Sequence, residues 1–183
     1  MPHPVTKPEI LAALESNAAT ITELFAAVPD ARLLAGDCDH WSPAHHLVHL
    51  TRTSLAIQRG VRSNSLPTHS TARSRTYADV RDAAAAALTA APKERMLEMG
   101  RVVVVEPHAR REDLVSAFVA ASAELRSAAA GWDEQTLDRH AMKHPLLGEL
   151  TVREMLFFCV FHERHHAKSV RALLERVSGS ARA

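Results

Sequence analysis

Apolar side chains recur at intervals of three and four residues along several long stretches of this chain. That spacing puts them on one face of an α-helix, whereas a half-buried strand would need strict alternation. The 183 residues include only 6 Gly and 9 Pro, so few positions interrupt a helix. A helix that is apolar on one side must bury that side against another element. The sequence therefore predicts an all-α fold, a four-helix bundle.

Capping residues and the positions of Gly and Pro give the expected helix boundaries. Ser42 is a good N-cap, Pro43 follows it at the first helical position, and Gly60 is expected to end that helix. Thr151 and Glu154 have the spacing of a capping box at the start of the last helix. The sequence predicts helices over residues 7–28, 43–59, 77–90, 110–130 and 152–177.

The segments between these helices are expected to be connections. Ser, Thr and Arg dominate residues 63–76, which predicts a mobile surface loop. Pro92 interrupts the third helix, and a short helical turn is expected to resume through Met96. Consecutive valines within residues 101–107 favour a short extended segment lying over the bundle. Residues 131–150 are expected to form a long connection.

Composition bounds the kind of protein this can be. The length suits one domain, residues 1–183, with 177–183 as a flexible tail. A net charge of +1 and an aromatic content of 4% argue against nucleic-acid binding. The chain shows neither a signal peptide nor 18 consecutive apolar residues, so no membrane span is expected. Cys38 lies in a predicted loop and Cys159 in a predicted helix, so we expect free thiols and a cytoplasmic protein.

The chain contains 12 histidines, and two of them occupy unusual positions. His162 and His166 share one face of the last helix with Met155, Cys159 and Leu173, where core side chains are expected. A buried imidazole without a partner costs about 1–3 kcal/mol. Two rings one turn apart can point their nitrogens at a single ion, and this spacing is the usual helical pair of metal ligands. The pair therefore favours a metal site.

The same stretch matches the metalloprotease pattern His162-Glu163-x-x-His166. A protease of that class needs a third ligand, and the sequence downstream of these histidines, from Lys168 on, offers no histidine and Glu175 as its only acid. Glu163 and Arg164 are expected to point to solvent or to a helix flank. We therefore interpret the two histidines as a metal pair in a different kind of protein.

A third ligand has to come from another helix, and the helix over 43–59 offers three histidines. His46 and His49 border its inner apolar stripe, whereas His45 lies nearer the polar side. By spacing alone, both His46 and His49 are possible ligands. The alternative is a structural network of hydrogen-bonded rings without an ion.

Two motifs together resemble the DinB superfamily, and the helical order of nearly the whole chain agrees. They are Trp41-Ser42-Pro43 followed by His49-Leu50, and His144-Pro145-x-x-Gly148-x-Leu150-Thr151 followed by His162-x-x-His165-His166. The resemblance implies a four-helix bundle of DinB-like type with one metal ion near one end. It also implies His49, His162 and His166 as the ligands, and so selects His49 over His46.

Members of that superfamily include S-transferases that use mycothiol or bacillithiol, a maleylpyruvate isomerase and proteins labelled metal-dependent hydrolases, and dimers are common. The resemblance thus implies a small-molecule substrate and a homodimer. Many relatives carry a Gly-Gln pair shortly after the last histidine, where this chain has Ala167, Lys168 and Ser169. A contact near the metal or the substrate is therefore expected to differ.

Three imidazoles leave a divalent ion with an open position, which is the mark of a catalytic site. Zinc is the default, and nickel or iron also suit nitrogen ligands. Such an ion activates either a water, whose pKa falls to about 7 on zinc, or a thiol. We expect a metal-dependent transferase with a low-molecular-weight thiol as co-substrate. The alternatives are a metal-dependent hydrolase of an amide or ester, and a non-catalytic bundle that binds metal or a small ligand.

Other side chains have two possible roles each. His144 is a candidate acid or substrate contact, or simply a turn residue before Pro145. Trp41 can line a pocket or belong to the core. Cys159 can ligate, although a buried cysteine usually packs as a small apolar side chain. No acid occurs between His40 and Ala78, and five arginines there form either a positive mouth or a solvated surface: Arg52, Arg59, Arg62, Arg73 and Arg75.

Overall fold

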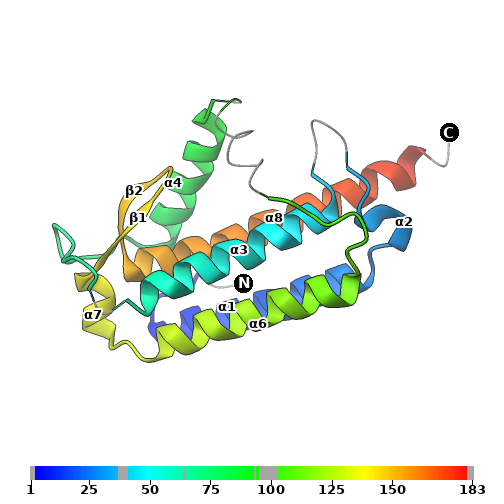
Figure 1. Cartoon of the computed structure of the whole chain (residues 1–183). Helices are drawn as coiled ribbons and strands as arrows, with labels where there is room; N and C mark the ends of the chain where they lie inside the picture. The colour runs from blue at the N-terminus through cyan, green and yellow to red at the C-terminus, as the bar shows by residue number, and fades with distance from the viewer. Residues whose placement is uncertain (1–2, 37–40, 64, 93, 95–102, 181–183) are drawn as a thin grey trace.

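The computed structural model describes residues 3–36, 41–63, 65–92, 94 and 103–180. In chain order its elements are α1 (Lys7–Ala26), α2 (Asp30–Leu33), α3 (Pro43–Val61), α4 (Tyr77–Ala90), α6 (Arg111–Ala130), α7 (Glu134–Arg139), β1 (Ala141–His144), β2 (Gly148–Thr151) and α8 (Val152–Ser180). The long helices α1, α3, α6 and α8 lie side by side (Figure 1), and α1 and α3 each pack against both α6 and α8. The predicted four-helix bundle is therefore confirmed, with α4 docked on α8 outside it.

The helices begin where the sequence predicts, because the expected caps form. The Oγ of Ser42 accepts the backbone N–H of His45 at the start of α3. Thr76 and Asp79 make a capping box for α4. At α8 the backbone N–H of Glu154 donates to Thr151 Oγ1 over 3.1 Å, and the Thr151 N–H donates back to Glu154 Oε2 over 3.2 Å.

Gly60 does not end its helix, which corrects the prediction from sequence. Helix α3 continues through Gly60 to Val61 and is capped by Arg62. A Cβ at position 60 would overlap the terminal methyl group of Met142 on β1. That methyl group ends a flexible side chain that could move aside, so the contact shows only that the hairpin packs closely on α3 here. A glycine within the last turn of a helix cannot be distinguished by sequence from a helix stop.

Residues 131–150 hold more structure than the predicted connection. Helix α7 begins at an N-cap, Asp133, and the antiparallel pair β1–β2 follows with Ala141 opposite Thr151. Gly148 adopts φ +73°, a backbone conformation that favours glycine. The hairpin and α7 both contact α8, so this segment closes one end of the core.

The loop over residues 63–76, predicted to be mobile, is anchored at both ends. Thr68 forms a β-bridge with His140. The backbone N–H of Arg75 donates to Glu154 Oε1 over 2.7 Å, and the Arg75 guanidinium pairs with the same carboxylate. The loop leads from α3 to α4, and these contacts hold it against His140 and against the first turn of α8.

Two apolar clusters form the core. One joins α4, α7 and the hairpin to the bundle and includes Leu14 and Leu156. The other includes Phe25, Leu47 and Phe118. None of the helices that the structure describes is long and apolar enough to cross a bilayer.

Further predictions concern the end of α8, the valine segment and the segments that the structure does not describe. Helix α8 continues to Ser180, past the predicted end at Val177, and residues 181–183 lie outside the described residues. Val103 is buried and Val105 packs on the second cluster, as expected of a valine segment over the bundle. The predicted helical turn through Met96 and the predicted loop position of Cys38 lie outside the described residues.

Candidate metal centre

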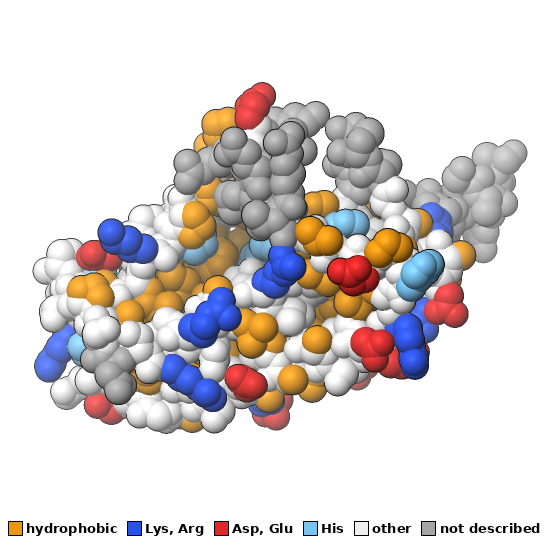
Figure 2. Space-filling view, viewed as in Figure 1, with side chains coloured by type: hydrophobic (Ala, Val, Ile, Leu, Met, Phe, Trp, Pro, Cys, Tyr) orange, Lys and Arg blue, Asp and Glu red, His pale blue; other side chains and the backbone are white. Residues whose placement is uncertain are grey.

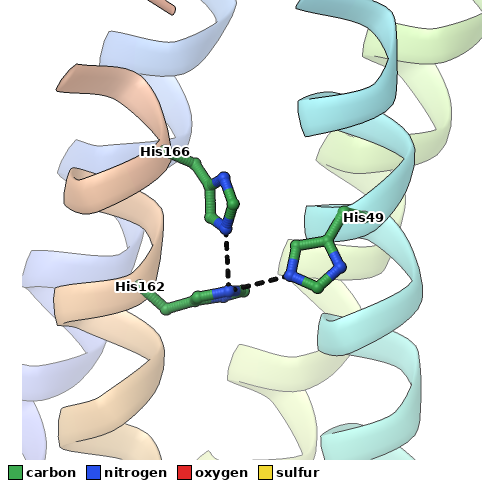
Figure 3. Close-up of side chains that lie close together, drawn as sticks. All are labelled: His49, His162 and His166. Carbon is green, nitrogen blue, oxygen red and sulfur yellow. Dashed lines mark hydrogen bonds between the residues drawn. The ribbon is translucent and has the colours of Figure 1, made fainter. Parts of the chain in front are cut away.

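The three histidines selected by the resemblance point toward one another in the space between α3 and α8 (Figure 3). The Nε2 atom of His162 lies 2.9 Å from Nε2 of His49 and 3.0 Å from Nε2 of His166. One ligand atom from each ring lies within 4.8 Å of the other two. Nitrogens bound to one zinc ion at about 2.1 Å are roughly 3.4 Å apart, so the two short separations would have to open by only a few tenths of an ångström.

The converging nitrogens fit a cation better than they fit one another. A neutral imidazole nitrogen carries either one proton or one lone pair. His162 Nε2 faces two other Nε2 atoms and can make only one good hydrogen bond with them. A divalent ion would accept all three lone pairs at once. The donor set present is therefore that of a metal centre.

Burial keeps these rings neutral, as metal ligands must be. Desolvation lowers the pKa of His49 to about 4. It lowers the pKa of His162 and His166 well below the usual value, and the neighbouring imidazoles lower it further. At neutral pH all three rings therefore offer a lone pair.

Two aromatic rings enclose the cluster. Trp41 lies 5.1 Å from the ring centre of His49 and stacks on His166 at 6.1 Å. Phe158 stacks on His162 at 5.0 Å. Trp41 thus takes the site-lining role of its two possible roles. Phe158 was missed by the sequence analysis, although its position one turn before His162 could have indicated it.

His46 and His144 lie beside the three-nitrogen cluster. The Nδ1 atom of His46 is 2.7 Å from Nδ1 of His166, on the side of that ring away from the cluster. His144 Nδ1 accepts the backbone N–H groups of Leu146 and Leu147 over 3.2 and 3.1 Å, so one nitrogen of its ring holds the turn between β1 and β2. Its ring also contacts Phe158 at 4.3 Å, and burial lowers its pKa to about 4.

Glu163 is buried, which contradicts its predicted position at the solvent or a helix flank. Its side chain is 2% exposed and turns toward α1, where Asn17 Nδ2 donates to Glu163 Oε2 over 3.1 Å. Burial raises the pKa of Glu163 to about 8. Sequence spacing could not show this, because the partner comes from a distant helix. Arg164, expected in the same place, is half-buried and donates to Asn17 Oδ1.

Cys159 takes the simpler of its possible roles, and the exposure of most of the arginines fits both of theirs. Cys159 is buried in the first apolar cluster, where burial raises the pKa of its thiol. Arg75 pairs with Glu154, and the other arginines of the acid-free stretch are exposed, namely Arg52, Arg59, Arg62 and Arg73. Figure 2 shows hydrophobic side chains gathered in a hollow over α3 and α8, with histidine side chains visible within it.

Fold and site together define a helical bundle protein whose donor set fits a divalent metal. The chain belongs to the DinB superfamily, which it matches over residues 13–170. Membership and the histidine cluster both fit a metal-binding protein. The crystal structure of TT2238, a four-helix bundle protein, is similar at 20% sequence identity with a TM-score of 0.59, covering 91% of this chain and 99% of that one. No curated protein matches the sequence.

Proposed function

We propose that this protein is a metal-dependent enzyme that transfers a low-molecular-weight thiol to an electrophilic small molecule. The observation that carries the proposal is the convergence of three Nε2 atoms from α3 and α8 on one point. Superfamily membership supports it, since thiol transfer is among the activities that the resemblance to that superfamily implies.

The ligands in this proposal are His49, His162 and His166, and the ion is divalent. Nitrogen donors suit zinc, nickel and iron, and zinc is our first choice. Three protein ligands leave a position for a substrate atom. The ion, when bound, supplies a Lewis acid that makes a thiol more acidic and so more nucleophilic.

The surrounding side chains fit a substrate with an apolar group. Trp41 and Phe158 wall the cluster on two sides. Because His144 Nδ1 accepts two backbone N–H groups, its proton sits on Nε2. That N–H is available to donate to a developing negative charge on the substrate.

A metal-dependent hydrolase of an amide or ester is the second candidate. It requires a general base, and the metalloprotease pattern would assign that role to Glu163. The carboxyl group of Glu163 instead accepts a hydrogen bond from Asn17 of α1 and is buried against that helix. This favours thiol transfer over hydrolysis.

The test combines metal content with turnover. The purified protein is loaded with zinc or nickel and mixed with an electrophilic bimane and mycothiol, bacillithiol or glutathione in turn. We expect turnover to require both metal and thiol and to fall at least about 100-fold in His162→Ala, with exposed His165→Ala as the matched control.

Other outcomes separate the alternatives. Ester or amide cleavage without any thiol would establish the hydrolase. A ligand that binds tightly and is recovered unchanged would establish the non-catalytic bundle. A fully metallated protein that is inactive with every thiol would contradict the proposal. We further propose a cytoplasmic homodimer, and light scattering of the purified protein tests the dimer.

A further inference from the structure

We propose that His46 is a positioning residue that accepts a hydrogen bond from His166 and thereby aims the His166 lone pair at the metal. The inference rests on the proposed metal site, and it gives a role to the histidine of α3 that is not among the three ligands. It predicts that His46 controls metal affinity without binding the ion.

The evidence is the contact between the two rings on the side away from the cluster. Nδ1 of His46 and Nδ1 of His166 are 2.7 Å apart, so one of them must carry the proton that the other accepts. The opposite nitrogen of His166, Nε2, is the one that faces His162. The two ring nitrogens of His166 thus have separate partners on α3 and α8.

The direction of this hydrogen bond decides whether His166 can bind a metal. If His46 donates, the neutral ring of His166 carries its own proton on Nε2, which then points into the cluster. If His166 donates, its proton sits on Nδ1 and Nε2 keeps a free lone pair. Coordination is compatible only with the second arrangement, in which His46 accepts. Such partners of metal-bound histidines fix the tautomer and the orientation of the ring.

His46 is held in place for this role. It lies one turn before His49 on α3, so the same helix supplies a ligand and the acceptor for another ligand. The ring of Trp41 packs edge-on against His46 at 5.4 Å. Neighbouring His45 cannot substitute, because its Nδ1 contacts Ser42 Oγ over 2.7 Å.

The test compares zinc dissociation constants by chelator competition at pH 7.5. We expect His46→Ala to bind zinc about 10–100-fold more weakly than wild type. His46→Gln offers an amide oxygen as an acceptor, and we expect it to recover most of the affinity. His165→Ala is the matched control, because His165 is an exposed histidine on α8 next to His166, and its affinity should not change.

Two further readouts separate positioning from other roles. Cobalt absorption should show the same coordination in wild type and His46→Ala, whereas a spectrum that reports a lost nitrogen ligand would make His46 a ligand and overturn the proposal. In zinc-bound wild type, nitrogen-15 NMR should place the His166 proton on Nδ1. Thermal unfolding of the metal-free variants shows whether His46→Ala is folded, and His46→Gln tests the proposal if it is not.

The results also distinguish this proposal from the proposed function. If wild type binds no metal more tightly than His49→Ala, the metal site itself is wrong. If wild type binds zinc, His49→Ala loses it and His46→Ala stays within about twofold of wild type, then only the role of His46 is wrong.

Discussion

Glu163 follows a candidate ligand in the sequence, yet its carboxyl group belongs to a different part of the molecule. Its Oε2 accepts a hydrogen bond from Asn17, and its Oε1 is buried without a hydrogen-bond partner among the described residues. Burial is the main cause that raises its pKa to about 8, against a weaker lowering by Asn17 and two arginines. The group is therefore neutral at pH 7.

We predict that Glu163→Gln stabilises the protein at pH 7. The folded-state pKa of about 8 lies above the unfolded value of 4.5, so the contribution of this one group to stability is most favourable below pH 4.5 and is lost as pH rises toward 8. Glutamine keeps the acceptor for Asn17 and does not titrate. We expect a gain of roughly 1–3 kcal/mol at pH 7 and a flatter slope between pH 5 and 8, measured by urea unfolding.

Glu175→Gln serves as the control for this prediction, because Glu175 is an exposed acid on the same helix. Zinc affinity and turnover of Glu163→Gln should match wild type, since the carboxyl group faces α1. A loss of turnover with intact metal binding would instead assign Glu163 the general-base role of a metalloprotease.

At the scale of elements, α8 explains which sequence predictions were right. The i, i+4 spacing correctly placed His162 and His166 on one face. The orientation of Glu163 was wrong because all residues from Val152 to Val160 are buried, so the first half of α8 is a central helix without a solvent side. A search for a single apolar stripe cannot detect such a central helix. A helical segment that is apolar on all sides does indicate one.

Short elements escaped prediction for a related reason. Helix α7 has six residues and strands β1 and β2 have four each, too few for a periodic pattern. Leu137 and Leu150 are fully buried, but the cluster that buries them is assembled from several elements along the chain. The long helices were predictable because each carries its own caps and apolar face.

The buried capping box of α8 gives a prediction at this scale. In Glu154→Ala the backbone N–H groups of Thr151 and Arg75 and the Arg75 guanidinium lose their common acceptor. We expect a loss of about 2–3 kcal/mol in the free energy of unfolding. Glu9→Ala removes an exposed capping box at α1 and should cost clearly less than Glu154→Ala. Equal losses in urea unfolding would contradict the importance of burial.

At the scale of the whole molecule, the histidine centre lies between the two apolar clusters and within the lengths of α3 and α8, and not near one end of the bundle as the resemblance implied. On α8 the first cluster extends to Phe161 and the second begins at Ala167. Asn17 marks the same boundary on α1, between Leu14 and Ala18. A polar layer thus crosses the core, and each side of it has an apolar cluster built from several elements.

This arrangement predicts that the metal tunes stability but is not required for folding, because each cluster packs without it. Chelated protein should keep its helical circular dichroism. Zinc at 1,000 times its dissociation constant should add about 4 kcal/mol, or roughly 8–16 °C in the unfolding midpoint of a chain this size. The triple variant His49→Ala, His162→Ala, His166→Ala should show no such rise. An open catalytic centre needs a scaffold that forms before the ion binds. Loss of helix on chelation would therefore contradict the prediction and make the ion a structural part of the fold.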